Sequence, residues 1–189
     1  EGADMRVAII TGASSGLGRE YARLADARGG YDQIWVIARR TGRLQTLACE
    51  LGTPVRQVAL DLLDPSAMDE LEDMLADAAA QAKLAGDALE VALLVNAAGL
   101  GKLGTYADVT RREIDAMVGL NCRALVDVTQ LALPYMRRGA RLMQIASSAS
   151  FQPLPGLNVY AATKAFVRSY TRALRFELRG RGIRVTAVC

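Results

Sequence analysis

The chain has 189 residues, of which 51% are hydrophobic, and this length and composition fit one domain with a substantial core. Lysine and arginine number 23 against 20 acidic residues and are spread over several segments, which argues against nucleic acid as the main ligand. The sequence contains no histidine, which excludes Ser-His-Asp hydrolases, Cys-His proteases and every histidine-ligated metal site.

Apolar runs rich in β-branched residues alternate along the chain with segments of helical periodicity. The runs predict six buried strands at Arg6–Thr11, Gln33–Ala38, Val55–Leu60, Glu90–Asn96, Arg141–Ser147 and Ile183–Cys189. The segments between them predict helices at roughly Gly16–Arg28, Arg43–Leu51, Pro65–Ala85, Arg111–Arg138 and Val159–Arg179. This alternation predicts an α/β fold with a doubly wound parallel sheet of strand order 3-2-1-4-5-6, whose ligands bind beyond the carboxyl ends of the strands.

Cysteine usage and the absence of long apolar runs set the expected compartment. Cys49, Cys122 and Cys189 lie far apart without CxxC spacing, so neither a disulfide framework nor a metal site is predicted. No apolar stretch reaches the roughly 18 residues of a membrane span, and the N-terminus lacks a signal-peptide pattern. We expect a cytoplasmic protein that binds no membrane. The opening Glu1–Asp4, ahead of Met5, is expected to be a remnant of cloning.

Three glycines lie where the first expected strand turns into the first helix: Gly12, Gly16 and Gly18. Their missing side chains leave room for a pyrophosphate, and a helix that begins near Gly16 directs free N–H groups and a partial positive charge toward it. A turn that serves only strand-to-helix packing is the alternative for an isolated pattern of this kind. The surrounding sequence favours dinucleotide binding.

Arginines occupy the end of the second expected strand, where an NAD site would place an acidic residue to bind the ribose hydroxyl. The chain reads Ile37-Ala38-Arg39-Arg40 at this point. Guanidinium groups bind a 2′-phosphate through charge-assisted, forked hydrogen bonds, so NADP(H) is the predicted cofactor. Arg39 is the preferred contact, Ser14 can add a hydroxyl, and Arg40 has a surface charge as its alternative interpretation.

Tyr160 and Lys164 are spaced to share one face of the last expected helix. Positions i and i+4 lie about 6 Å apart along a helix axis. The positive charge of a lysine favours the phenolate form of a nearby tyrosine, and a tyrosine so assisted can exchange protons near neutral pH. The pair therefore predicts acid-base chemistry.

Three motifs together resemble the short-chain dehydrogenase/reductase family, in its main TGxxxGxG branch. They are TGASSGLG at Thr11–Gly18, NAAG at Asn96–Gly99 and YAATK at Tyr160–Lys164. The resemblance spans nearly the whole chain and implies a Rossmann-like three-layer fold in residues 5–189, a single dinucleotide-binding domain. It also implies hydride transfer between NADP(H) and a small carbonyl or secondary alcohol.

The resemblance assigns roles to individual positions. It implies Tyr160 as the catalytic acid, Lys164 as its helper that also binds the nicotinamide ribose, and Ser147 as the residue that holds the substrate carbonyl. Ser148 and Ser150 compete for that last role, but family members carry the serine thirteen residues before the tyrosine. Asn121 matches an asparagine that supports a water beside the lysine. The implied cofactor contacts are Gly12, Ser14, Ser15, Gly16, Leu17, Gly18, Arg39, Arg40, Asp61, Leu62, Asn96, Ala97, Ala98, Gly99, Tyr160 and Lys164.

Family members continue beyond the sixth strand with a substrate-covering segment and a last strand, whereas this sequence stops at Cys189. We therefore expect a C-terminally incomplete domain, and the sequence does not identify its substrate. The resemblance also implies a homodimer or homotetramer through the helices at Arg111–Arg138 and Val159–Arg179. Two other functions are alternatives: a non-catalytic NADP-binding sensor, which the complete set of catalytic residues disfavours, and an extended-branch nucleotide-sugar epimerase, whose glycine spacing differs.

Overall fold

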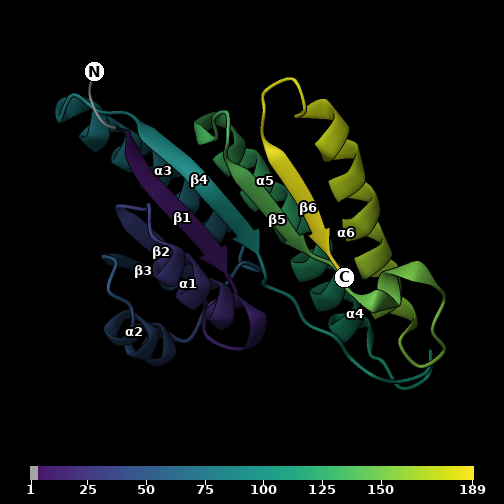
Figure 1. Cartoon of the computed structure of the whole chain (residues 1–189). Helices are drawn as coiled ribbons and strands as arrows, with labels where there is room; N and C mark the ends of the chain where they lie inside the picture. Colours follow the sequence, from purple (N-terminus) through teal and green to yellow (C-terminus); the bar gives the residue numbers. More distant parts are fainter. Residues whose placement is uncertain (1–3) are drawn as a thin grey trace.

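A computed structural model describes residues 4–189 as one six-stranded sheet with the order β3-β2-β1-β4-β5-β6 (Figure 1). Every neighbouring pair of strands is parallel. The predicted fold class and strand order are therefore confirmed. The strands are β1 (Met5–Thr11), β2 (Gln33–Ile37), β3 (Val55–Val58), β4 (Leu89–Asn96), β5 (Arg141–Ile145) and β6 (Arg184–Val188).

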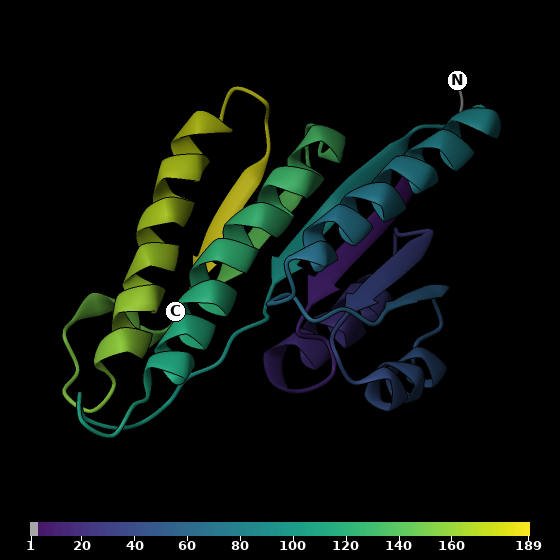
Figure 2. The ribbon, with the colours of Figure 1, turned by 180° about the vertical axis from the view of Figure 1, so that it is seen from behind.

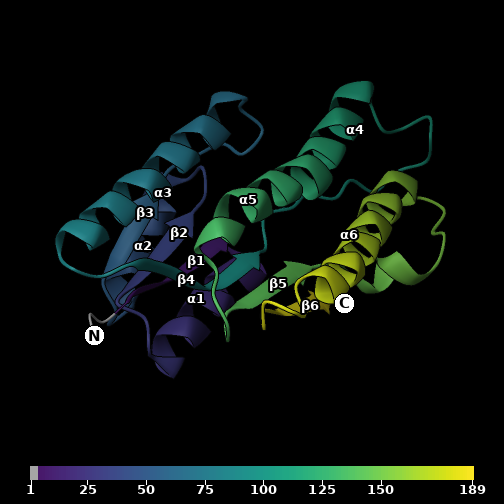
Figure 3. The ribbon, with the colours of Figure 1, turned by 90° about the horizontal axis from the view of Figure 1, so that it is seen from above.

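Helices cover both faces of the sheet. They are α1 (Gly16–Arg28), α2 (Thr41–Glu50), α3 (Ser66–Leu84), α4 (Arg111–Val118), α5 (Leu125–Ala132) and α6 (Asn158–Glu177). Figure 2 shows α3, α5 and α6 side by side across one face, and Figure 3 shows the same layers from above. On the opposite face α1 and α2 pack over β1 and β2 through alanines and leucines.

The alternation of side chains along β1 explains how one strand serves both layers. Val7 and Ile9 belong to the core shared with α3, α5 and α6, whereas Ala8 and Ile10 belong to the core shared with α1 and α2. Successive side chains of a strand point to opposite faces, so a strand covered on both sides is apolar throughout. This is why the central strands appear in the sequence as continuous apolar runs.

The expected single helix Arg111–Arg138 is wrong, because the structure divides it. A π-helical turn, η1 (Gly119–Ala124), separates α4 from α5, and a 3₁₀ turn, η2 (Leu133–Tyr135), ends the segment before Arg138. Pro134 in that turn has no N–H to continue the α-helical bonding. The π turn carries Asn121, and such turns are frequent at functional sites.

The start of α4 is fixed by a capping box. The Thr110 hydroxyl accepts the Glu113 N–H at 3.3 Å, and the Glu113 carboxylate accepts the Thr110 N–H at 2.9 Å. Lys102 lies 2.9 Å from the same carboxylate. These hydrogen bonds, that of Lys102 first, lower the pKa of Glu113 to about 2. The segment that follows β4 is thereby tied to α4.

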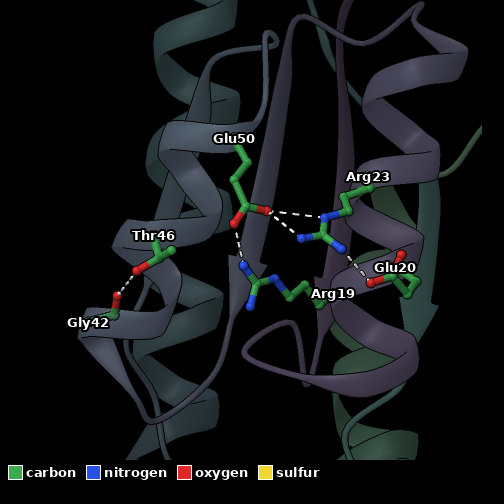
Figure 4. Close-up of polar contacts among 6 residues, drawn as sticks. All are labelled: Arg19, Glu20, Arg23, Gly42, Thr46 and Glu50. Atoms are coloured by element: carbon green, nitrogen blue, oxygen red, sulfur yellow. Dashed lines mark hydrogen bonds and ion pairs between the residues drawn. The ribbon is translucent and has the colours of Figure 1, made fainter.

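Polar side chains also join α1 to α2 (Figure 4). Glu50, the last residue of α2, accepts hydrogen bonds from Arg19 and from Arg23, the latter at 2.8 and 3.1 Å. Arg23 also donates to Glu20 at 2.6 Å. The hydrogen bonds, that of Arg23 first, lower the pKa of Glu50. Because α1 begins at the glycine-rich turn, this network holds the turn's helix in place.

The chain's N-terminal end is described from Asp4 onward. The predicted cloning remnant Glu1–Asp4 lies outside the described residues except for Asp4, whose carboxylate accepts hydrogen bonds from Arg137 at 2.7 and 2.8 Å. Along residues 4–189, no helix combines the length and apolar character that a membrane crossing requires.

Candidate active site

A cleft of about 720 Å³ lies beyond the carboxyl ends of the strands. It is bounded by the segments that follow all six strands and by the start of α6. All the predicted site residues except Asn96 and Asn121 line it. Those that line it are Gly12, Ser14, Ser15, Gly16, Leu17, Gly18, Arg39, Arg40, Asp61, Leu62, Ala97, Ala98, Gly99, Ser147, Tyr160 and Lys164.

Two glycines of the turn are required by close backbone contacts. Gly12 has a φ of +68°, and a Cβ there would lie 2.7 Å from the backbone N of Ala98. A Cβ on Gly18 would lie 2.5 Å from the carbonyl oxygen of Gly12. The Thr11 hydroxyl accepts N–H bonds from Ala97 and Ala98 at 3.1 and 3.0 Å. The ends of β1 and β4 are thus held together where they form the cleft wall.

The N-terminus of α1 faces the cleft with the chemistry of an anion site. Its N-cap residue, Ser15, makes no side-chain cap bond, and its first turn carries no acidic residue. Free N–H groups and the helix dipole at such an end attract negative charge. The helix runs for 13 residues to Arg28, so the dipole is fully developed.

Arg40 reaches toward the same turn. Its guanidinium donates to the hydroxyls of Ser14 and Ser15 at 3.0 and 2.9 Å. Arg39, preferred from the sequence, instead lies 3.6 Å from a carboxylate oxygen of Asp61. The structure therefore groups one guanidinium with two hydroxyls, and Arg40 rather than Arg39 belongs to that group.

Tyr160 and Lys164 lie in the first two turns of α6, which begins at Asn158. The Lys164 Nζ is 5.8 Å from the centre of the Tyr160 ring and donates to the carbonyl oxygen of Ile145 at 2.7 Å. Only 6% of Lys164 is exposed, and its burial lowers the pKa of its ammonium group. A cation so placed, with a fixed anchor, can act on both the phenol and a ligand in the cleft.

The three serines that follow β5 are separated by the structure. Ser147 lines the cleft and its Oγ accepts the N–H of Ala149 at 3.1 Å, which starts the 3₁₀ turn η3 (Ser148–Phe151). Ser148 also lines the cleft. Ser150 is only 3% exposed and its hydroxyl lies 3.8 Å from the Cys189 thiol. Ser147 and Ser148 can therefore contact a ligand in the cleft, whereas Ser150 is buried and does not line it.

A sequence model described as short chain dehydrogenase matches residues 6–189 of this chain. The match includes the strands, the glycine-rich turn and the Tyr160–Lys164 pair described above. The chain belongs to the short-chain dehydrogenase family.

Relatives within this family are named as reductases and dehydrogenases. Sulfoacetaldehyde reductase 2 of Chromohalobacter salexigens is 39% identical over 189 residues, covering 96% of this chain and 70% of that protein. Serine 3-dehydrogenase of Agrobacterium fabrum is 34% identical over 186 residues, covering 95% of this chain and 69% of that protein. A short-chain dehydrogenase from Sphingobium yanoikuyae, solved with NADPH, superposes with a TM-score of 0.80 at 31% identity, covering 96% of this chain and 69% of that one.

Asn121 of this short-chain dehydrogenase lies behind the cleft, not in its lining. Its Oδ1 accepts the N–H of Leu100 at 2.9 Å, and its Nδ2 donates to the Leu100 carbonyl at 2.8 Å and to the Thr163 hydroxyl at 2.9 Å. A Cβ on Gly99 would lie 3.1 Å from the Asn121 Oδ1 and 3.4 Å from the Lys164 Nζ. Asn121 thus fixes the segment after β4 against α6, close to the lysine.

Asn96 also points away from the cleft. Its side chain is 2% exposed, and its Nδ2 donates to the Thr129 hydroxyl of α5 at 2.9 Å. The side chain of Asn96, the last residue of β4, therefore faces the helix layer and not the cleft. The wall of the cleft at this point is formed by Ala97, Ala98 and Gly99.

The sequence reasoning missed residues that act through backbone groups or size. The Ile145 carbonyl anchors Lys164, and Leu100 anchors Asn121. Gly101 gives room to the phenol, because a Cβ there would lie 2.9 Å from the Tyr160 ring. A backbone carbonyl or N–H cannot be recognised from the sequence, because every residue has one. Gly101 is a recognisable signal, because it is a glycine two residues after the NAAG motif.

Proposed function

We propose that this chain transfers hydride between NADP(H) and a small carbonyl or secondary alcohol, with Tyr160 as the proton donor and acceptor. The observation that carries the proposal is one continuous cleft. At one end the cleft is lined by the glycine-rich turn and by Arg40 with its partners Ser14 and Ser15. At the other end it is lined by Ser147, Tyr160 and Lys164. The relatives named as reductases and dehydrogenases support the same reaction class.

The residues of the cleft fit a phosphorylated dinucleotide. Gly12 and Gly18 let the turn pack closely, and a Cβ on Gly16 would meet nothing within 4 Å, so the start of α1 is open to a pyrophosphate. The Arg40 guanidinium with the Ser14 and Ser15 hydroxyls would hold a 2′-phosphate. Lys164 would hold the nicotinamide ribose, since an ammonium group has three donors and the Ile145 carbonyl uses one.

The reduced cofactor, when bound, supplies the hydride that adds to the carbonyl carbon. Tyr160 gives its proton to the carbonyl oxygen as negative charge develops there, so that an alcohol forms. Ser147 donates a hydrogen bond to the same oxygen, and the Lys164 ammonium, 5.8 Å from the centre of the Tyr160 ring, places a positive charge beside the reacting groups. Proton transfer of this kind contributes about 10²–10⁴-fold to the rate. In the reverse direction the phenolate takes the alcohol proton.

The test is NADPH consumption, followed by absorbance, with a panel of carbonyl compounds. The panel contains a sulfonated aldehyde, a β-keto acid and uncharged aldehydes and ketones, because the named relatives point to anionic substrates. Turnover of one class is expected, together with saturable NADPH binding measured by fluorescence. NADPH binding without turnover of any compound would favour the non-catalytic sensor. Absence of NADPH binding would refute the proposal.

Replacing Arg40 by alanine is expected to weaken NADPH binding about 10–100-fold and to leave NADH binding within about twofold. The reason is the loss of charge-assisted hydrogen bonds, worth roughly 1.5–3 kcal/mol, to a phosphate that NADH lacks. Arg39→Ala is the matched control, because Arg39 is 65% exposed and already faces Asp61. Fluorescence titration with both cofactors measures the effect. A larger loss from Arg39→Ala would place the phosphate on Arg39 instead.

We also propose that two copies associate through the outer face of α6. This face carries Phe166 and Phe176, which are 44% and 75% exposed, with Ala162 and Ala173 at helical spacing. Beside Phe166, the apolar residues Ile114, Val118 and Cys122 line a groove between α4 and α6. An exposed apolar stripe of this kind marks an interaction surface.

Phe166→Glu is expected to convert this dimer into a monomer, because it places a charge in the middle of that stripe. Sedimentation velocity measures the change. Leu84→Glu is the control, since Leu84 is 89% exposed at the end of α3, which α5 separates from α6 in the helix layer (Figure 2). A wild-type protein that sediments as a monomer at all concentrations would refute this assembly.

A further inference from the structure

We propose that Thr129 is a positioning residue whose single hydroxyl sets the carboxyl ends of both β4 and β5. This inference rests on the proposed function for its catalytic meaning. Asn96 and Gln144 are register partners at the ends of these strands. The Thr129 Oγ1 accepts the Asn96 Nδ2 at 2.9 Å and the Gln144 Nε2 at 3.0 Å. It donates its own proton to the Leu125 carbonyl at 2.6 Å.

The hydroxyl has no capacity left, because a threonine offers one donor and two acceptor positions. Thr129 and Gln144 are fully buried and Asn96 is 2% exposed. The Asn96 Oδ1 and the Gln144 Oε1 have no partner among the described residues. Apart from a 3.5 Å contact of the Asn96 Nδ2 with the Leu125 carbonyl, each amide is oriented by its bond to Thr129. One hydroxyl therefore determines how two strand ends sit against α5.

The residues that follow these two strand ends form the reacting part of the cleft. After Asn96 come Ala97 and Ala98, whose N–H groups bind the Thr11 hydroxyl. After Gln144 comes Ile145, whose carbonyl holds the Lys164 ammonium at 2.7 Å. A displacement of either end would move the cofactor wall or the lysine. Misplacement of reacting groups by about 1 Å can cost about 100-fold in rate.

The experiment compares Thr129→Val, which keeps the shape and removes the hydroxyl, with Thr129→Ser, which keeps the hydroxyl. Thr171→Val is the matched control: Thr171 is 2% exposed on α6 and its hydroxyl bonds the Val167 carbonyl at 2.6 Å, the same i−4 bond. Hydrogen exchange in the free protein is measured at the amides of Ala97, Ala98 and Ala146. We expect Thr129→Val to accelerate exchange there about 10-fold relative to Thr171→Val, and Thr129→Ser to restore it.

NADPH affinity and kcat are measured on the same variants, below the temperature at which any of them unfolds. Thr129→Val is expected to raise the NADPH Kd and lower kcat about 10-fold each, whereas Thr171→Val changes both less than about twofold. Should Thr129→Val fail to fold, Gln144→Met removes one bond only and is expected to accelerate exchange at Ala146 and lower kcat more than it weakens NADPH binding.

Exchange and kinetics that match those of Thr171→Val would overturn the positioning role. The exchange measurement needs no cofactor, so it tests Thr129 even if the wild-type protein binds no NADPH. In that case the proposed function alone fails.

Discussion

Tyr160→Phe is expected to lower kcat at least about 100-fold and to leave the NADPH Kd within about twofold. The substitution removes the proton that neutralises the oxygen of the reduced carbonyl, a contribution of about 10²–10⁴-fold. It keeps the ring, which packs against Gly101, and it leaves the Lys164 bond to the Ile145 carbonyl untouched. Steady-state kinetics on a substrate from the carbonyl panel and a fluorescence titration measure the two quantities.

Tyr135→Phe provides the control for loss of a phenol hydroxyl. Tyr135 lies in the turn η2, packs against the core and is not among the residues that line the cleft. It is expected to keep the wild-type rate. A Tyr160→Phe protein with more than one tenth of the wild-type kcat would mean that another group, such as a water, donates the proton, and the assignment of Tyr160 would be wrong.

Much of the fold could be predicted from the sequence because the strands β1, β2 and β4 are buried on both faces over most of their length. The run from Leu89 to Asn96 is buried at every position, so it reads as one apolar strand. The helix Gly16–Arg28 was predicted with the bounds that it has, since a glycine begins it and Gly29 with a φ of +69° ends it. The order of the strands follows from right-handed crossovers and the position of the glycine turn.

The break between α4 and α5 could not be predicted in the same way. The π turn carries Asn121, whose amide bonds Leu100, a residue 21 positions earlier. No local pattern encodes such a long-range bond. Pro134, in contrast, is a local signal for the end of the segment, and the predicted extension to Arg138 overlooked it.

The choice between Arg39 and Arg40 also depended on information outside the local sequence. Both follow β2, but only Arg40 is directed at Ser14 and Ser15, while Arg39 faces Asp61 beyond β3. Which of two neighbouring side chains points to the glycine turn depends on how β1, β2 and β3 lie beside one another. Likewise, the inward direction of Asn96 follows from its pairing with Gln144 and from the helix beneath them.

Gly12→Ala is expected to lower the free energy of unfolding by about 3 kcal/mol or more and to abolish NADPH binding. A left-handed conformation costs a non-glycine residue roughly 1–2 kcal/mol, and Gly12 has a φ of +68°. The added methyl would also lie 2.7 Å from the Ala98 nitrogen and 2.8 Å from the Ala97 carbonyl group, both backbone atoms. Either β1 or β4 must then shift, which separates the Thr11 hydroxyl from its N–H partners.

Gly86→Ala separates backbone strain from steric overlap. Gly86 has a φ of +87°, and a Cβ there would meet nothing within 4 Å. Its substitution is expected to cost only the conformational part, about 1–2 kcal/mol, and to leave NADPH binding unchanged because Gly86 lies beyond α3 and outside the cleft. Urea denaturation and NADPH titration of both variants give the comparison. Equal destabilisation by the two substitutions would show that β1 and β4 move apart at little cost to make room for the methyl group. The hydrogen bonds of the Thr11 hydroxyl would then not hold the cleft wall rigidly.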